Sequence, residues 1–394
     1  MLKNQNIICI SSIDWDFIWQ GHQEIMSSLA KNGNRVLFIE NTGVRVPGIR
    51  DISRIKNRVK NWLRGIKGMR EETPNLYIFS PLVLPFPYSR IARWINHHLI
   101  LSILDRWTRV MDFSDPIIWT FLPTPLSLDI AESLVKKLAI YYCIDNFSSS
   151  SVSAKKVKRS EEKLLRKMDL VFVTSKGLYD HCSKYNEKVY NFPFAVNFNE
   201  FEKMRMKKNK PVPEDLANIK RPVIGYVGGV HKWLDQKLLK TLAKNHPEYS
   251  FVFVGPAQTD ITLLKSVDLK NIYFLGNKDH KDVPLYIENF DACIIPYLIA
   301  DYTKNVYPTK LNEYLAMGKP VISTALPEII EFNRRYGEVV YVAEEEEKFS
   351  RYIKDAVSEK DIIKRDRYIE IARENSWKAR IEKMSSLIEE EVEK

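Results

Sequence analysis

The sequence lacks long hydrophobic runs. Near its start, the apolar stretch Ile7–Ile10 is short and gives way at once to two serines. A secretory signal needs a longer apolar core, and a membrane-spanning helix needs roughly 20 apolar residues. We therefore expect neither at this end of the chain, and we expect the protein to stay in the cytoplasm.

Cysteine is scarce, with four residues in a chain of 394. Cys9, Cys143, Cys182 and Cys293 lie far apart, so their spacing fits neither a zinc site nor a disulfide framework. Three of the four stand in apolar, strand-like runs, where a reduced thiol behaves as a small hydrophobic group. The sequence also contains no low-complexity tract. We expect reduced thiols and no bound metal.

The length and the pattern of apolar runs predict an α/β fold with two domains. With 394 residues and 45% hydrophobic content, the chain is too long for one hydrophobic core and long enough for two. Short β-rich runs alternate with helical patterns, which is typical of parallel sheets. In the first half, the expected strands are 6–12, 35–40, 76–80, 117–121, 139–144 and 170–174.

A charged stretch punctuated by prolines, 202–213, lies between the two halves and is typical of a linker. A single last helix is expected over about 361–393. It contains Trp377 and ends in acidic residues.

The run from Tyr307 to Thr324 carries several functional signals close together. Pro308 and Thr309 are residues that start helices, with Thr309 as a candidate N-cap. The first turn of a helix presents free N–H groups and a positive dipole end, which attract an anion. Lys310 adds a cation there, and Glu313, one turn on, offers its carboxylate to two neighbouring sugar hydroxyls.

This pattern predicts a nucleotide-sugar site that holds a phosphate and a ribose. The same residues also fit ordinary α/β structure, in which Gly318 and Pro320 end an amphipathic helix. Lys310 and Glu313 would then form a solvated ion pair. The residues alone leave both interpretations open.

Residues 310–322 resemble the nucleotide-sugar motif of the group 1 glycosyltransferases, glycosyltransferase family 4. Residues 223–235 are similar to the strand and glycine-rich turn that open the second domain of these enzymes. That similarity is strongest to the bacterial branch that builds cell-surface polysaccharides of the teichuronic-acid type. Other strands of the family are matched by five further segments of this chain: 169–175, 191–197, 250–256, 271–276 and 291–297 resemble them.

The resemblance implies the GT-B architecture, in which two Rossmann-like domains face each other across a cleft. It implies an acceptor-side domain over residues 1–205 and a nucleotide-sugar-binding domain over 206–375. A C-terminal helix over 376–394 would cross back to the first domain. It also implies that the transferred sugar retains its anomeric configuration, with the acceptor attacking the face that the nucleotide leaves.

The chain departs from the family where the diphosphate is held. Many members place an Arg and a Lys after the glycine-rich turn, whereas this chain has His231 and Lys232. These two and Lys310 are the substitutes, although His231 and Lys232 fit exposed polar loop residues equally well. The N–H groups of Gly228 and Gly229 would assist, because glycine lets the backbone approach a phosphate closely.

A second departure concerns the transferred sugar. Family members commonly carry two glutamates eight positions apart, but the position eight residues before Glu313 is Asn305. We expect the loop that ends at Asn305, with Asp301, to face the sugar. Loop 276–284 would contact the base through its backbone groups, with Asn277 and Lys278 as candidate residues. The candidate donor-binding residues are Gly228, Gly229, His231, Lys232, Asn277, Asp301, Thr309, Lys310, Leu311 and Glu313.

Transfer needs a group that manages the acceptor proton, and ligands meet open α/β sheets at the carboxyl ends of strands. Asp145 follows the expected strand 139–144 and is the first candidate for a base or an acceptor-orienting carboxylate. An Asx turn explains Asp145 nearly as well. Asp14, Asp16 and His22 cluster after the first strand, and Asp14 and His22 complete the catalytic candidates.

Asp14-Trp-Asp16 also resembles the metal-binding Asp-x-Asp signature of the other glycosyltransferase architecture. That signature belongs in mid-chain at a nucleotide site, and three-residue matches are common by chance. We therefore expect neither a metal nor another cofactor. Lys310, the helix start at Pro308 and the glycine amides would stabilise the departing diphosphate.

The net charge of +10 is unevenly distributed. Between residues 45 and 70, nine Lys or Arg stand against one acid, Asp51, with Trp62 among them. Basic surface beside aromatic side chains suits anionic lipid headgroups. The apolar stretches 81–88 and 91–104 either belong to the core or dip into a bilayer. A nucleic-acid partner is not expected, because the basic patch lacks a groove-reading motif.

Residues and resemblance together predict a retaining, metal-independent hexosyltransferase of the EC 2.4 class. It would move a sugar from a nucleotide-diphosphate donor to a lipid-linked cell-envelope polysaccharide precursor, from a peripheral position on the inner face of the membrane. Two alternatives stay open: a nucleotide-sugar epimerase of the same fold, and a non-catalytic nucleotide-sugar-binding subunit, which Asn305 favours. Sugar interconversion without an acceptor would identify the first, and donor binding without turnover the second.

Overall fold

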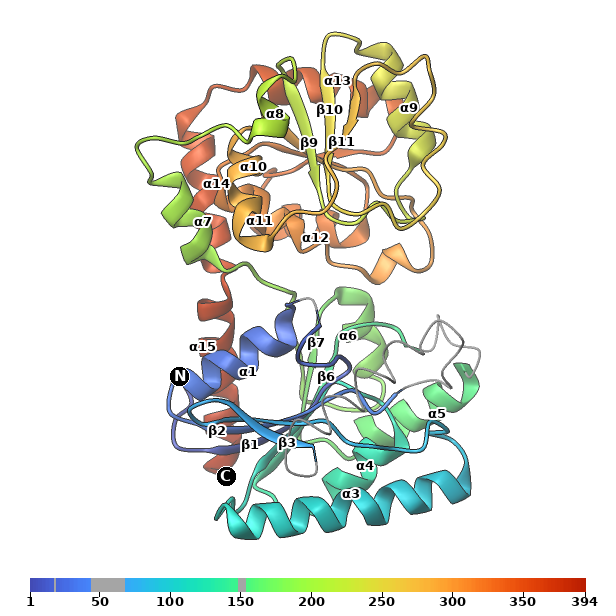
Figure 1. Cartoon of the computed structure of the whole chain (residues 1–394), viewed down its shortest axis with the longest axis vertical. Coiled ribbons are helices and arrows are strands. Elements are labelled where there is room, and N and C mark those ends of the chain that lie inside the picture. The colour runs from blue at the N-terminus through green and yellow to red at the C-terminus, as the bar shows by residue number, and fades with distance from the viewer. Residues whose placement is uncertain (18, 44–67, 148–153) are drawn as a thin grey trace. The chain divides into compact units, whose positions relative to one another are not determined.

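The computed structural model describes residues 1–17, 19–43, 68–147 and 154–394 (Figure 1). These residues fold into two α/β units. Unit 1 contains residues 1–193 and 381–394, and unit 2 contains residues 194–380. Helix α7 (Phe198–Arg205), upstream of the boundary expected after residue 205, buries Phe198 and Phe201 in the core of unit 2.

Unit 1 is built on a sheet whose eight described strands run in the order β3-β4-β2-β1-β5-β6-β7-β8. All neighbours are parallel except β3 and β4, which are antiparallel. The strands are β1 (Asn6–Ile10), β2 (Arg35–Ile39), β3 (Met69–Thr73), β4 (Leu76–Phe79), β5 (Ile117–Thr120), β6 (Leu138–Cys143), β7 (Leu170–Val173) and β8 (Val189–Asn191). The central strands are buried on both faces, which explains their continuous apolar runs.

Helices cover both faces of this sheet (Figure 1). Ile8 of β1 shares one core with Ile100 of α3, and that core extends to α4, α5 and α6. Helix α1 packs on the opposite face, where its His22 meets Phe121. The helices are α1 (Gly21–Lys31), α3 (Arg90–Val110), α4 (Pro125–Ser133), α5 (Ala154–Leu165) and α6 (Lys176–Cys182).

Unit 2 contains a sheet of six strands in the order β11-β10-β9-β12-β13-β14, all parallel. The strands are β9 (Val223–Val227), β10 (Ser250–Val254), β11 (Ile272–Phe274), β12 (Ala292–Ile295), β13 (Val321–Thr324) and β14 (Tyr341–Ala343). The helices are α7, α8 (Glu214–Ala217), α9 (Gln236–Asn245), α10 (Val283–Glu288), α11 (Lys310–Ala316), α12 (Pro327–Tyr336), α13 (Glu346–Ser358) and α14 (Ile362–Glu374). They flank both faces of the sheet, as expected for a doubly wound α/β domain (Figure 1).

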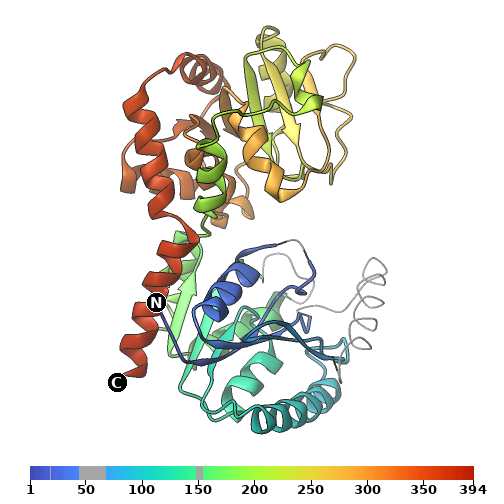
Figure 2. The same ribbon diagram turned by 60° about the vertical axis from the view of Figure 1, so that its left-hand side comes forward.

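The last helix, α15 (Trp377–Val392), belongs to unit 1 from Ile381 onward. It lies beside the edge strand β8, where Lys188 pairs with Glu391 (Figure 2). The sequence pattern predicts one helix over about 361–393, and this prediction is wrong, because α14 and α15 are separated at Asn375 and Ser376.

Specific contacts cause this break. The Asn375 side chain donates to the Ile371 carbonyl and accepts from Arg380, while Ser376 forms a β-bridge with Val196. These contacts hold the backbone out of the helix, and an apolar pattern carries no sign of them. Residues 192–197, expected to belong to a strand, form only this bridge beyond the end of β8.

The other strands that the sequence predicts agree with the structure to within about two residues, whereas β3 and β14 were not predicted. The four cysteines are free and buried. Among the described helices, none is long and apolar enough to cross a membrane. Most of the basic stretch 45–70 lies outside the described residues, so the prediction that it meets lipid is not tested.

Candidate active site

In unit 2, the turn after strand β9 and the turn after strand β10 each contain a glycine, and the backbones of these two turns are in contact. Gly228 and Gly255 both have positive φ, +126° and +147°. The N–H of Gly228 donates to the Val254 carbonyl over 2.8 Å, and a Cβ on Gly255 would lie 2.2 Å from the Gly228 carbonyl oxygen. Side chains are therefore excluded at this contact. The N–H of Gly229 has no acceptor among the described residues, so it is the amide of the turn that a ligand can use.

Lys310 lies against this turn. Its Cε would be 3.3 Å from a Cβ on Gly228. Its Nζ donates to the Tyr297 hydroxyl and lies 5.1 Å and 5.0 Å from the ring centres of Tyr226 and Tyr297. Within the described parts of the chain, no carboxylate pairs with Lys310. The two tyrosines therefore hold the ammonium group without neutralising its charge, as an anion site requires.

His231 lies against Gly229, the next glycine of the same turn. Its Nε2 would be 2.8 Å from a Cβ on Gly229, and its ring stacks on Trp233 with 3.8 Å between the ring centres. Burial, and then the charge of Lys310, lowers the pKa of His231. We call Tyr226, Gly228, His231, Tyr297 and Lys310 the Lys310 cluster.

Helix α11 is fixed to strand β9 by a buried tyrosine. The Tyr314 hydroxyl accepts from the N–H of Val227 over 2.8 Å. Asn312, fully buried, donates to the Phe194 carbonyl and accepts from the Tyr307 hydroxyl. These bonds set the position of Lys310 at the start of the helix.

Glu313 follows one turn after Lys310 and is partly exposed. Its Oε1 lies 3.7 Å from Nε2 of His280. Thr309 stands at the N-cap position of α11, but its hydroxyl makes no capping bond and its backbone is already helical. The Leu311 side chain is fully buried in the core, and its N–H donates to the Pro308 carbonyl. The Thr309 cap predicted from the sequence is therefore not formed, and the Leu311 side chain packs in the core.

The remaining donor candidates are exposed. Lys232 lies in the turn beside His231, and Asn277 lies in the loop after β11. Asp301 pairs with Lys304 over 3.1 Å. The described residues show no contact between these three and Lys310. Asn305 ends the short 3₁₀ turn η3 (Thr303–Asn305), where the family carries a glutamate.

In unit 1, the order of the strands reverses between β1 and β5, which is where open α/β sheets bind ligands. His22 lies at this point. Its Nε2 is 3.0 Å from the Ser12 hydroxyl and its ring centre is 3.9 Å from that of Phe121. Burial lowers the pKa of His22 to about 3, so the imidazole is neutral at neutral pH. Its Nδ1 is buried with no partner among the described residues.

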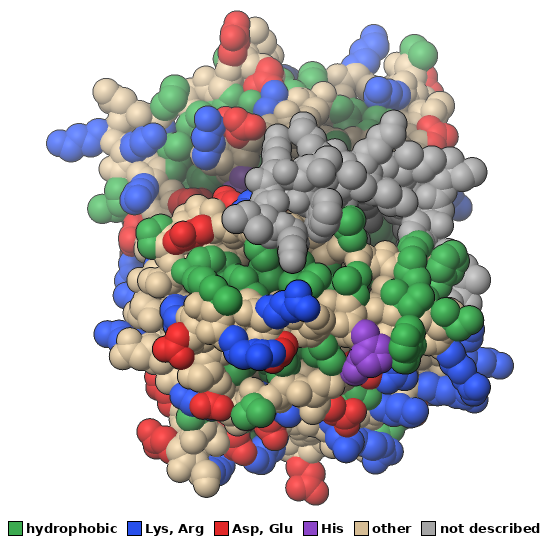
Figure 3. Space-filling model, turned by 60° about the horizontal axis from the view of Figure 1, so that its bottom comes forward, with side chains coloured by type: hydrophobic (Ala, Val, Ile, Leu, Met, Phe, Trp, Pro, Cys, Tyr) green, Lys and Arg blue, Asp and Glu red, His purple; other side chains and the backbone are tan. Residues whose placement is uncertain are grey.

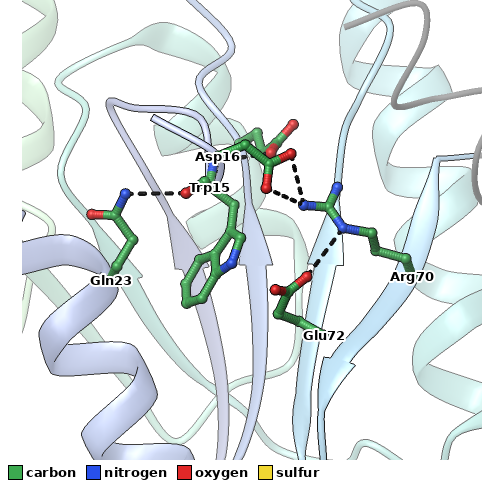
Figure 4. A network of polar contacts seen from close by, with 6 residues as sticks. Trp15, Asp16, Gln23, Arg70 and Glu72 are labelled. Carbon is green, nitrogen blue, oxygen red and sulfur yellow. Dashed lines mark hydrogen bonds and ion pairs between the residues drawn. The ribbon is translucent and has the colours of Figure 1, made fainter. Parts of the chain in front are cut away.

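The loop after β1 is held by a polar network (Figure 4). Arg70 of β3 bonds to Asp16 over 3.2 Å and to Glu72 over 3.4 Å, and the Trp15 carbonyl accepts from Gln23. The Trp15 N–H donates to Glu40, a buried carboxyl at the end of β2. Burial raises the pKa of Glu40, with a smaller contribution from Asp14. Glu40 was not among the candidates from the sequence, because the predicted strand 35–40 includes it, whereas β2 ends at Ile39.

Asp145 follows β6, and burial raises its pKa. Its Oδ1 accepts from the Asn146 N–H and its carbonyl accepts from the Phe147 N–H, so it also stabilises a local turn. No contact among Asp14, His22 and Asp145 occurs in the described residues. Nor do these residues contain a group of three His, Cys, Asp or Glu side chains that could hold a metal ion.

Comparisons with known proteins agree with this arrangement. Residues 209–375 match the family model "Glycosyl transferases group 1". The chain is 31% identical over 212 residues to TuaH of Bacillus subtilis (strain 168), whose name assigns it as a teichuronic acid biosynthesis glycosyltransferase. This match covers 50% of the chain and spans about half, 53%, of that relative.

Solved structures match over the whole chain. A sucrose-phosphate synthase from Thermosynechococcus elongatus has a TM-score of 0.67 at 16% identity, covering 98% of this chain and 99% of its own. HepE of Anabaena in complex with UDP has a TM-score of 0.67 at 12% identity, covering 98% and 100%. A UDP-forming α,α-trehalose-phosphate synthase from Burkholderia xenovorans has 0.65 at 11% identity, covering 99% of each.

At these identities the structural matches establish the fold, and the predicted GT-B class is confirmed. The family match covers the unit that contains the Lys310 cluster. Residues 209–375 therefore form a domain of the glycosyl transferases group 1 family.

Proposed function

We propose that this protein is a retaining, metal-independent glycosyltransferase of family 4, which moves a sugar from a nucleotide-diphosphate donor to a lipid-linked cell-envelope polysaccharide precursor. The observation that carries the proposal is the Lys310 cluster. An ammonium group without a carboxylate partner lies beside a glycine turn with a free N–H, inside a group 1 glycosyltransferase domain.

The donor would bind with its diphosphate at Lys310 and the N–H of Gly229. In the departing nucleotide, negative charge grows on the phosphate oxygen that leaves the sugar, and a preorganised cation and amide stabilise that charge. His231, which lies against Gly229, adds a donor. Glu313, one turn along α11, would accept from the ribose hydroxyls.

UDP is the first nucleotide to test. Among the structural neighbours, HepE is described in complex with UDP and the trehalose-phosphate synthase is described as UDP-forming. The Gly276–Pro284 loop, with Asn277, would contact the base. The loop that contains Asp301 and Asn305 would face the transferred sugar.

The acceptor side rests on unit 1. Asp145 is the candidate base, because burial raises its pKa and it follows a strand at the ligand-binding end of the sheet. Neutral His22, fixed by Ser12, and Asp14 would position the acceptor. The cell-envelope role draws on the name of the Bacillus relative, and a lipid-linked acceptor would place the enzyme on the inner face of the membrane.

A non-catalytic donor-binding subunit is the second candidate. Asn305 favours it, because a carboxylate that the family uses at the sugar is replaced by an amide. Such a subunit would bind the donor at the Lys310 cluster but would release no nucleotide in the presence of an acceptor.

Thermal stabilisation by UDP, GDP, dTDP, ADP and their sugars tests the donor site. A ligand that binds only the folded state raises Tm by mass action. We expect one nucleotide family to raise Tm, and Lys310→Ala and Glu313→Ala to abolish the rise. Lys244→Ala, an exposed lysine on α9, is the matched control and should behave as wild type. If no nucleotide shifts the wild type, or the Lys310 variant responds like the control, the site assignment is wrong.

A further inference from the structure

A basic hollow of about 730 Å³ opens on unit 1 between the start of α3, α4 and α5. Half of the residues that line it are Lys or Arg, while Glu132 is the one acid. The basic side chains include Arg90 and Arg93 from α3 and Lys156, Arg159 and Lys163 from α5. No step of the proposed transfer uses them.

Most of this positive charge is not neutralised within the protein. Arg93 pairs with Asp129, and Lys167 pairs with Glu132 over 3.4 Å. For Arg90, Lys156, Arg159 and Lys163, no carboxylate partner occurs in the part of the chain that the structure describes. Like charges held this close repel one another, so a bound anion would relieve the repulsion.

Tyr88 lines the hollow, and its hydroxyl group lies inside the wall. Its hydroxyl oxygen is buried and has no hydrogen-bond partner among the described residues. Burial, and then the charge of Glu161, raises the pKa of Tyr88 to about 12, so the hydroxyl keeps its proton. A buried hydroxyl without a partner is costly unless a ligand completes it. Phosphate oxygens would do so.

The helix that carries Arg90 and Arg93 also exposes an apolar face. Ile100 and Leu104 of α3 are fully buried, whereas Ile91, Trp94 and Leu99 on other sides of the helix are 75%, 65% and 44% exposed. Together with Ile95, which is 38% exposed, these three stand at positions i, i+3, i+4 and i+8, and apolar side chains at these spacings form a stripe along a helix. This stripe begins beside the basic hollow.

The loop before α3 extends the apolar surface. Leu82, Leu84 and Phe86 are each more than a third exposed. Figure 3 brings forward the underside of Figure 1, which carries α3, and shows hydrophobic side chains gathered beside Lys and Arg side chains. Patches of exposed large apolar residues mark interaction sites on proteins.

We infer that the exposed stripe of α3 and the basic hollow beside it form a docking surface for a bilayer that contains anionic phospholipid. Ile91 and Trp94 would enter the boundary between headgroups and acyl chains, where Trp is favoured. Arg90, Lys156, Arg159 and Lys163 would bind headgroup phosphates, with the Tyr88 hydroxyl as a further donor. A soluble anionic glycan would explain the cations but not the apolar stripe, and an apolar protein partner would not explain the cations. The inference rests on the proposed function only in that a lipid-linked acceptor brings the enzyme to a membrane.

Vesicle flotation tests this surface directly. The full chain is mixed with vesicles of phosphatidylcholine alone or of phosphatidylcholine with phosphatidylglycerol. We expect binding to the mixed vesicles only. Lys156→Glu with Arg159→Glu should weaken it by on the order of tenfold or more, because each basic side chain near an anionic surface contributes about a factor of five. Ile91→Ser with Trp94→Ser should weaken it at high salt as well as at low salt.

Matched controls separate local docking from overall charge. Lys237→Glu with Lys244→Glu reverses two exposed lysines on α9 of unit 2 and should bind vesicles like the wild type. Equal losses in this control and in the α5 variant would overturn the inference. Binding to soluble polyglucuronate without binding to vesicles would also overturn it. So would a dimer, detected by sedimentation velocity, that dissociates when Ile91→Ser and Trp94→Ser are introduced.

The same variants distinguish failure of docking from failure of the proposed function. The docking residues lie in unit 1 and the Lys310 cluster lies in unit 2. All docking variants should keep the nucleotide-induced rise in Tm, which also shows that they fold. Vesicle binding without a nucleotide-induced rise in Tm would support the docking surface and reject the donor site. A nucleotide-induced rise in Tm without vesicle binding would support the donor site and reject the docking surface.

Discussion

The N–H of Val227 donates to the hydroxyl of Tyr314 over 2.8 Å, and this bond ties the last residue of β9 to the middle of α11. The glycine turn begins at the next residue, and Lys310 stands one turn earlier on the helix. One buried tyrosine therefore fixes the two parts of the Lys310 cluster relative to each other. The sequence motif that contains Tyr314 gives its type and position but not this bond.

Tyr314→Phe should destabilise the protein and weaken donor binding together. The substitution leaves the buried Val227 N–H without an acceptor, which costs about 1–3 kcal/mol. Urea unfolding and the nucleotide-induced rise in Tm measure the two effects. Tyr249→Phe is the control, because no hydrogen bond to the Tyr249 hydroxyl occurs in the described residues. A Tyr314 variant as stable as this control would refute the positioning role.

Gly255→Ala should be markedly more damaging than Gly337→Ala. Both glycines have positive φ, but a Cβ at Gly255 would lie 2.2 Å from the Gly228 carbonyl oxygen, whereas nothing lies within 4 Å of one at Gly337. Gly337 has φ +87° and ψ −176°, a conformation almost restricted to glycine, so the control should lose about 1–3 kcal/mol from backbone strain alone. Gly255→Ala should lose clearly more and also weaken nucleotide binding, since the Gly228 turn must move. Equal losses in stability would contradict the close contact.

His22 should make stability depend on pH. Burial lowers its pKa from 6.5 to about 3, so below pH 6.5 the unfolded chain takes up a proton that the folded chain refuses. The contribution of His22 to the free energy of unfolding is therefore fully present above pH 6.5. It is lost as pH falls, by up to about 1.4 kcal/mol per pH unit between roughly pH 6 and 4. His22→Gln removes this contribution. The difference in unfolding free energy between wild type and variant should narrow or reverse as pH falls, and a constant difference would show that His22 titrates normally.

Nucleotide binding should raise the pKa of His231. In the free protein, burial and Lys310 lower it. A diphosphate between His231 and Lys310 favours the imidazolium form, so binding should take up a proton and affinity should rise as pH falls toward the lowered pKa that His231 has in the free protein. NMR titration of the imidazole signals with and without UDP measures the change. His246, bonded to Ser350 in the same unit, is the internal reference. Identical titration of His231 in both states would place the diphosphate elsewhere.

The sheets were predictable because their strands are buried on both faces and therefore appear as continuous apolar runs. Two strands were not predicted. One is β3, an antiparallel edge strand with the sequence Met-Arg-Glu-Glu-Thr, whose polar side chains face away from any core. The other is β14, an edge strand of three residues that is only partly buried. The interruption between α14 and α15 was also hidden, because Asn375 and Ser376 contact residues distant in the sequence: Asn375 donates to the Tyr336 hydroxyl, and Ser376 forms a bridge with Val196.

At the candidate site, the residues that belong to short sequence motifs were predicted, whereas the residues that only the fold brings together were not. Lys310, Glu313 and the glycine turn belong to short motifs, so they were found. Tyr226 lies within β9 and Tyr297 follows β12, and both have the apolar surroundings of core residues, yet they hold the ammonium group of Lys310. The hollow beside α3 was equally hidden, because its cations come from two helices separated by more than forty residues.

Release of nucleotide from a sugar donor, measured with and without membrane-extracted lipid-linked glycan, tests the central claim most directly. The account predicts nucleotide diphosphate and a lengthened glycan only when donor and acceptor are both present, and neither with Lys310→Ala. Conversion of the donor sugar without an acceptor would identify an epimerase. Tight donor binding with no release under any condition would contradict the transferase assignment and leave a binding subunit.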